Sequence, residues 1–141
     1  MRVLAVDVGA RRVGLAISDP SRMLARPLTA VEVVSDADAV ERVVAAARDL
    51  AAAEDGLAEI VVGLPRRLDG SPSAMTARVT AFVDALRQRI PVPVATEDER
   101  LSSHEAESRL ALNERDWRKR KTKLDAAAAA VILQDYLDRG R

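Results

Sequence analysis

The sequence predicts an α/β fold in which one mixed, five-stranded β-sheet carries helices on both faces. Two observations lead to this prediction. The chain opens with three short apolar segments separated by turns, which is typical of antiparallel strands. Apolar segments then alternate with stretches of helical period, which indicates crossover connections between parallel strands. The length of 141 residues and the hydrophobic content of 48% suit a single buried core, so we expect one domain over residues 1–141.

The first three segments are expected to form the antiparallel half of the sheet. The stretch "RVLAVDVG" is almost continuously apolar, as a central buried strand is. A turn at "GARR" leads to "VGLAISD", so the two segments predict a β-hairpin. The third segment, "MLARPLTAVEV", contains Pro27, which favours an edge strand or a break.

The next segments predict the parallel half of the sheet and its crossover helices. Apolar residues recur at helical spacing over residues 36–54, and "AEIVVGLP" follows as a short buried strand. A second amphipathic helix is expected with Ser71 as its N-cap and Pro72 as its first residue. The stretch "PVPVATED" is the last predicted strand.

Two further helices are expected in the C-terminal part of the chain. Ser102 and Glu105 have the spacing of a capping box, which predicts a short helix ending near Leu112. The basic run "NERDWRKRKTK" interrupts the apolar periodicity, so we expect a loop or a frayed extension there. The stretch "LDAAAAAVILQDYLDRG" predicts a final helix that Asp125 opens and Gly140 ends.

Composition excludes several classes of chemistry. The chain has no cysteine, so disulfides, thiolate metal sites and thiol catalysis are absent. The formal net charge is zero, so the overall charge does not indicate a polyanionic partner. The sequence contains neither a signal peptide nor a long apolar run, so we expect a cytoplasmic protein without a membrane partner.

Three acidic residues stand where apolar or structural residues would cost less: Asp7 within the first strand, Glu99 at the end of the last strand, and Asp125 at the start of the last helix. A central first strand and a helix laid across its edge can bring the three together, where they would repel one another. A divalent cation relieves such repulsion, and oxygen-only ligands favour Mg²⁺ or Mn²⁺. Two such ions stabilise the attacking and leaving oxygens in phosphodiester hydrolysis.

Each of these acids also has a simpler interpretation. Asp7 could accept hydrogen bonds from turn amides at the end of the hairpin. Glu99 belongs to the acidic run "EDE", which could be a solvated loop. Asp125 could serve only as the N-cap of the alanine-rich helix.

Basic residues supply the candidate nucleic-acid contacts. The run before Asp125 concentrates positive charge around one aromatic ring, and such a patch can contact phosphates and stack on an unpaired base. A solvated loop with its tryptophan against the last helix is the alternative. The candidates in this run are Trp117, Arg118, Lys119, Arg120, Lys121 and Lys123. Further candidates for the same groove are Arg11, Arg12, Arg66, Arg67 and Arg100, the last of which could instead form a salt bridge with the acidic run.

Four stretches resemble the signature segments of the YqgF/RuvX family: "AVDVGARRVGLAISD", "EIVVGLPRRLDGS", "TEDERLSSHEA" and "KLDAAAAAVILQDYL". They occur in the family's order and span nearly the whole chain. The resemblance implies a ribonuclease H-like fold and a metal-dependent endonuclease, with the family's three acids falling on Asp7, Glu99 and Asp125. The chain departs from the family pattern at His104 and at Arg66-Arg67, which bears on substrate preference and not on the three acids.

The resemblance implies one of two substrates: the 5′ end of precursor 16S rRNA, which we favour, or a branched DNA junction. Ribosomal particles are a further candidate partner, and both a monomer and a homodimer are compatible with the sequence. Two other functions compete with the nuclease. An ATP-binding enzyme of the actin and sugar-kinase kind also begins with an acid–x–Gly strand and turn, but it needs two such domains. A non-catalytic nucleic-acid or ribosome-binding module is the other.

Overall fold

The sheet of the protein has five strands in the order β3-β2-β1-β4-β5. The computed structural model describes residues 1–67, 69–98 and 117–140, with only the backbone given for residues 117–124. The strands are β1 (Arg2–Val8), β2 (Arg12–Ser18), β3 (Ala25–Glu32), β4 (Leu57–Leu64) and β5 (Val94–Asp98). The helices described are α1 (Asp36–Ala52), α2 (Ala74–Arg89) and α4 (Trp117–Arg139).

The strand pairing confirms the predicted mixed sheet. β1 pairs antiparallel with β2, and β2 pairs antiparallel with β3. β1 also pairs parallel with β4, and β4 pairs parallel with β5. β1 is therefore the central strand, as its continuous apolar character predicts.

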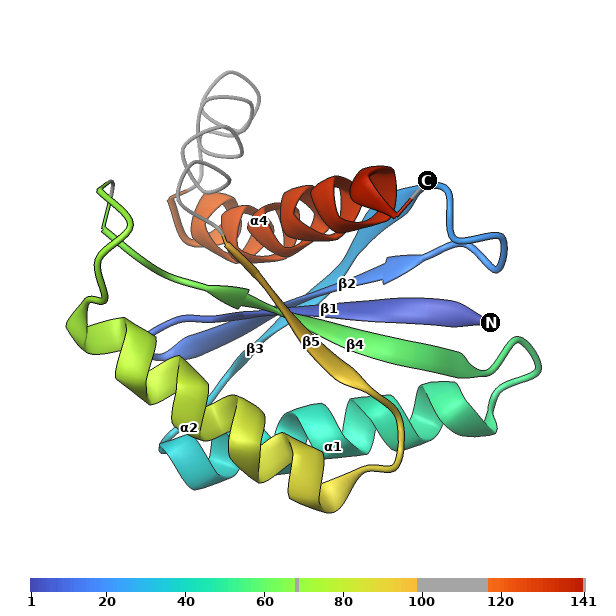
Figure 1. Ribbon diagram of the computed structural model, residues 1–141, viewed down its shortest axis with the longest axis horizontal. Coiled ribbons are helices and arrows are strands. Elements are labelled where there is room, and N and C mark those ends of the chain that lie inside the picture. Colours follow the sequence, from blue (N-terminus) through green and yellow to red (C-terminus); the bar gives the residue numbers. More distant parts are fainter. Residues whose placement is uncertain (68, 99–116, 141) are drawn as a thin grey trace.

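Helices cover both faces of the sheet (Figure 1), and an apolar layer lies between the sheet and the helices on each face. Helices α1 and α2 cover one face, and α4 lies across the other. Side chains alternate along β1, so Leu4 and Val6 join the core under α1 and α2, whereas Val3 and Ala5 join the core under α4. Helix α1, which the sequence predicts over residues 36–54, has its expected apolar stripe, because Val40 and Val43 are buried in the core under α1 and α2.

The edge strand β3 is mostly exposed, and it carries Pro27 as the sequence predicts. Its register with β2 shifts between Leu15 and Ala16, so that Leu15 pairs with Thr29 and Ala16 pairs with Pro27. A bulge and a proline on an edge both oppose pairing with a further strand.

The N-cap of α2 is Ser73, so the prediction of Ser71 is wrong. The backbone amide and the hydroxyl of Ser71 both donate to Asp69 Oδ1, at 2.9 and 2.6 Å, which holds Ser71 in a turn. Ser73 N instead donates to Thr76 Oγ1 at 2.8 Å, as in a capping box.

The last helix begins earlier than predicted. Residues 117–123 belong to α4, although the sequence analysis expected a loop or a frayed extension over this basic run. Lysine and arginine are good helix formers, so the loss of apolar periodicity there does not end the helix. Asp125 consequently lies about two turns inside α4 and neither opens nor caps it.

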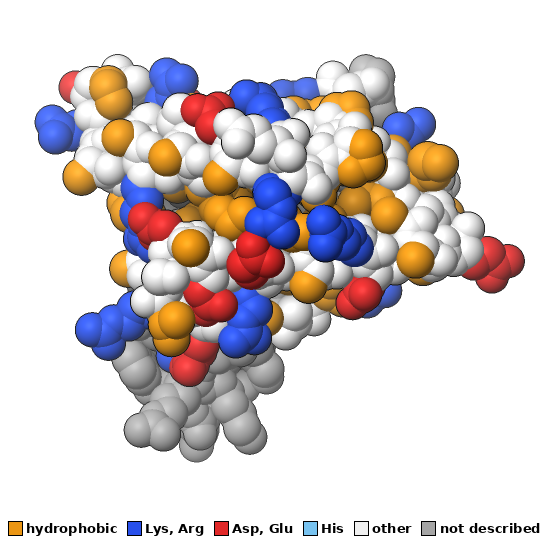
Figure 2. Space-filling model, turned by 90° about the horizontal axis from the view of Figure 1, so that it is seen from below, with side chains coloured by type: hydrophobic (Ala, Val, Ile, Leu, Met, Phe, Trp, Pro, Cys, Tyr) orange, Lys and Arg blue, Asp and Glu red, His pale blue; other side chains and the backbone are white. Residues whose placement is uncertain are grey.

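The outer face formed by α1 and α2 shows no single-sign patch. Lys and Arg side chains alternate with Asp and Glu side chains across it (Figure 2). Several of them form ion pairs, including Arg78 with Asp36 and Arg89 with Glu41. Among the described helices, none combines the length and apolar character that crossing a bilayer requires.

Candidate active site

The candidate site begins with Asp7, near the carboxyl end of the central strand. Because Val3 and Ala5 of β1 face α4, the alternation of the strand places Asp7 on the same face. Asp7 is half-buried and pairs across the antiparallel ladder with Gly14 of β2. The carboxylate is thus carried by the most firmly held strand of the sheet.

Gly14 brings α4 into direct contact with this part of the sheet. A Cβ atom at Gly14 would lie only 2.1 Å from the carbonyl oxygen of Asp125 and 3.2 Å from Ala126 N. The backbone of the helix therefore lies on the residue that pairs with Asp7. This close approach brings the backbone of Asp125 beside the strand pair that carries Asp7.

The turn between β1 and β2 forms the rim of the site. Gly9 N donates to the carbonyl oxygen of Arg12 at 2.8 Å, and a Cβ at Gly9 would lie 2.9 Å from that oxygen. Val33 N donates to the carbonyl oxygen of Arg11 at 2.9 Å. The turn is therefore tied both to its own hairpin and to the end of β3.

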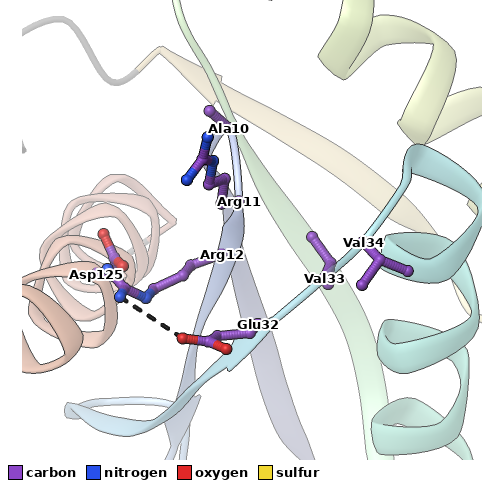
Figure 3. A pocket seen from close by; sticks show the side chains of 8 residues that line it. Ala10, Arg11, Arg12, Glu32, Val33, Val34 and Asp125 are labelled. Carbon is purple, nitrogen blue, oxygen red and sulfur yellow. Dashed lines mark ion pairs between the residues drawn. The ribbon is translucent and has the colours of Figure 1, made fainter.

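A cleft of about 600 Å³ opens beside this turn (Figure 3). Its walls come from the turn, the end of β3 and α4. The lining residues are Gly9, Ala10, Arg11, Arg12, Glu32, Val33, Val34 and Asp125. Within the cleft, Arg12 forms an ion pair with Glu32 at 3.7 Å. The structure thus brings Arg11, Arg12 and Asp125 together at one cleft.

The other predicted site residues either lie away from the cleft or fall outside the described residues. Arg66 and Arg67 are exposed after β4, which ends at the same edge of the sheet as β1, but they do not line the cleft. Glu99 and Arg100 lie outside the described residues. The described part of the chain contains no group of three metal-ligating side chains. Because Glu99 lies outside the described residues, the three-carboxylate site stays a prediction.

The predicted contacts of the basic run are placed only by their backbone. They lie in the first two turns of α4, immediately before Asp125. The structure describes the backbone of these residues and not their side chains. These residues are Trp117, Arg118, Lys119, Arg120, Lys121 and Lys123.

Sequence analysis missed a second polar site, at the C-terminal end of α4. Tyr136 donates from its hydroxyl to Glu59 Oε2 at 2.8 Å, and Glu97 forms an ion pair with Arg139. These four residues line a second cavity of about 550 Å³, which Asp125 does not line. Burial and the bond to Glu59 raise the pKa of Tyr136 to about 12. The alternation of side chains along β5 could have placed Glu97 on the face covered by α4. Its partner Arg139 lies on a helix far along the chain, so no sequence pattern near Glu97 indicates the ion pair.

The second cavity gives a pH prediction for Glu97, which is only 6% exposed. Burial raises the pKa of its carboxyl above the ordinary value of 4.5, while Arg139 opposes this shift. The folded state therefore holds the proton to higher pH than the unfolded state, so stability falls as pH rises from 4.5 through the raised pKa. We expect Glu97→Gln to remove this loss. Urea unfolding of both proteins between about pH 4 and 7 measures it.

Glu41→Gln provides a control of opposite sign. The hydrogen bond from Arg89 lowers the pKa of Glu41, so wild-type stability relative to this variant should fall as pH decreases below 4.5. Parallel pH profiles for the wild type and Glu97→Gln would contradict the prediction for Glu97.

A mixed five-stranded sheet with helices on both faces defines a ribonuclease H-like fold. The structure of the RuvC protein of T. thermophilus in complex with a Holliday junction substrate has the same fold. The TM-score is 0.52, with 17% sequence identity over 99% of this chain and 96% of that one. This likeness confirms the predicted fold.

The chain belongs to the RuvX family, since residues 1–139 match the family model described as "RuvX: Holliday junction resolvase". A relative from Roseiflexus sp. (strain RS-1) is 40% identical over 99% of this chain and 96% of its own length. A relative from Anaeromyxobacter sp. (strain K) is 43% identical, over 99% of this chain and 98% of its own length. Both carry the description "Putative pre-16S rRNA nuclease". The family resemblance seen in the four sequence segments is thereby confirmed.

Proposed function

We propose that the protein is a metal-dependent endonuclease that hydrolyses phosphodiester bonds at the 5′ end of precursor 16S rRNA. The observation that carries the proposal is the contact of α4 with Gly14, which places Asp125 against the residue paired with Asp7. The descriptions of the relatives support the substrate. The reaction would be performed in the cytoplasm by one domain over residues 1–141. Ribosomal particles are the proposed binding partner.

The side chains of the site fit a hard divalent cation. Asp7 and Asp125 offer carboxylate oxygens, which are the ligands that Mg²⁺ and Mn²⁺ prefer. These two residues, with Glu99 as the expected third ligand, would hold the metal. At these carboxylates, the chemistry supplied by two such ions would be activation of a water and stabilisation of charge on the reacting oxygens.

The arginines of the cleft have a separate role in the proposal. Arg11 and Arg12 would bind phosphates on the turn side of the site, and the basic first turns of α4 would extend this contact along the nucleic acid. Their positive charge offsets the acidic residues that would otherwise repel a polyanion.

A branched DNA junction is the second candidate substrate, because the family model carries the description of a Holliday junction resolvase. The test compares cleavage of labelled precursor 16S rRNA and of a four-way DNA junction, with Mg²⁺ or Mn²⁺ and with an EDTA blank. We expect metal-dependent cleavage at the 5′ end of the rRNA. Cleavage of the junction alone would move the assignment to branched DNA. Binding without cleavage of either would leave a non-catalytic nucleic-acid-binding module.

A further inference from the structure

Arg12 has a fixed backbone and a side chain that lies within the cleft. Its carbonyl oxygen accepts a hydrogen bond from Gly9 N at 2.8 Å, and Arg12 is the register partner of Glu32 in the pairing of β2 with β3. Its side chain is 21% exposed, so most of it lies against the protein. Movement of Arg12 is therefore restricted to its outer side chain, which carries the guanidinium group.

Glu32 competes for this guanidinium from the neighbouring strand. Figure 3 shows Arg12 extending from β2 with its ion pair to Glu32, while Asp125 of α4 lines the same cleft. The distance of 3.7 Å is long for a charged hydrogen bond, and the Glu32 side chain is 83% exposed. Such an exposed pair contributes little stability, so it opens easily for a stronger anionic partner.

We propose that Glu32 is a specificity-determining residue that restrains Arg12 until a nucleic-acid phosphate displaces it. On binding, the guanidinium of Arg12 leaves Glu32 and contacts the phosphate, which it can do through two parallel N–H donors. Glu32 thus weakens binding of a backbone that engages Arg12, because the ion pair must first be broken, so a phosphate is held only when its contact with Arg12 outweighs that of Glu32. This inference rests on the proposed function, because it requires that the cleft bind nucleic acid.

The two arginines of the cleft differ in a way that allows a test. Arg11 is exposed on the turn, and no ion pair is found for it among the described residues, whereas Arg12 is paired with Glu32. If Glu32 acts through Arg12, its removal should matter only while Arg12 is present. If Glu32 acts only by repelling phosphates, its removal should matter equally with either arginine replaced.

The experiment measures binding of a fluorescent single-stranded RNA fragment at low salt, with EDTA present to prevent cleavage. Glu32→Gln should tighten binding about threefold, which is the scale of an exposed ion pair. The same tightening is expected in an Arg11→Gln background and should vanish in an Arg12→Gln background. Glu41→Gln, which removes another exposed negative charge, on α1 and away from the cleft, should leave binding unchanged.

Each other result overturns the inference in a distinguishable way. Tightening in all backgrounds, or an equal effect of Glu41→Gln, would make Glu32 a source of general repulsion only. Unchanged affinity of Glu32→Gln would show that the ion pair does not restrain Arg12. Failure of the wild-type protein to bind RNA or DNA would overturn the proposed function itself, together with this inference.

Discussion

Asp7→Asn should abolish metal-dependent cleavage while leaving the fold and nucleic-acid binding intact. Asparagine has the shape of aspartate but lacks the negative charge that holds a divalent cation. Loss of partners that only orient metal ligands costs about 10–100-fold in metal affinity or activity, so loss of a ligand should reduce cleavage by more than about 100-fold. Single-turnover cleavage of labelled precursor rRNA measures the effect.

The matched control is Asp55→Asn. Asp55 is exposed and forms an ion pair with Arg2 at 2.9 Å. Arg2 begins β1, so this pair lies at the end of the strand opposite to Asp7. The same chemical change there should leave cleavage at the wild-type rate. A folded Asp7→Asn protein that cleaves as fast as the wild type would remove Asp7 from the site.

Gly14→Ala should have the largest effect on stability. The added methyl group would lie 2.1 Å from the carbonyl oxygen of Asp125, and neither a Cβ atom nor a backbone oxygen can rotate away. The helix must move off the sheet or the strand must bend. Overpacking typically costs about 1–3 kcal/mol, and we expect the free energy of unfolding to fall by about 3 kcal/mol. This corresponds to a decrease in Tm of roughly 10 °C.

Gly14→Ala should also reduce cleavage, because displacement of α4 separates Asp125 from Asp7. Gly140→Ala is the control, since a Cβ at Gly140 would have ordinary contacts, the nearest at 3.6 Å from Leu137 O. Thermal unfolding and cleavage of the two variants are compared under the same conditions. Equal Tm values for Gly14→Ala and the wild type would contradict the close contact of helix and sheet.

The sheet could be predicted from the sequence because its signals are local. The hairpin turn after β1, the proline of the edge strand and the switch to helical period each act over a few residues. These signals determine the kind of connection between successive strands, and connection rules then leave few sheet orders. Asp7 could be singled out for the same reason, because it is a charged residue within an apolar strand.

The rest of the site depends on contacts between distant segments. The residue of α4 that lies on Gly14 is 111 positions further along the chain, so no spacing rule indicates it. Glu32 meets Arg12 only through the register of β3, which a bulge shifts. The start of α4 was misplaced because the basic residues favour a helix by propensity and not by an apolar pattern.

The most direct test of the account is the binding of Mn²⁺, measured by the electron paramagnetic resonance signal of the free ion. Wild-type protein, Asp7→Asn and Asp125→Asn are titrated without nucleic acid, and Asp55→Asn serves as the control. If both acids hold the metal, each of the first two substitutions should weaken Mn²⁺ binding by at least about tenfold, while Asp55→Asn binds as the wild type does. Wild-type affinity in either Asp7→Asn or Asp125→Asn would contradict a metal site built where α4 meets the central strand.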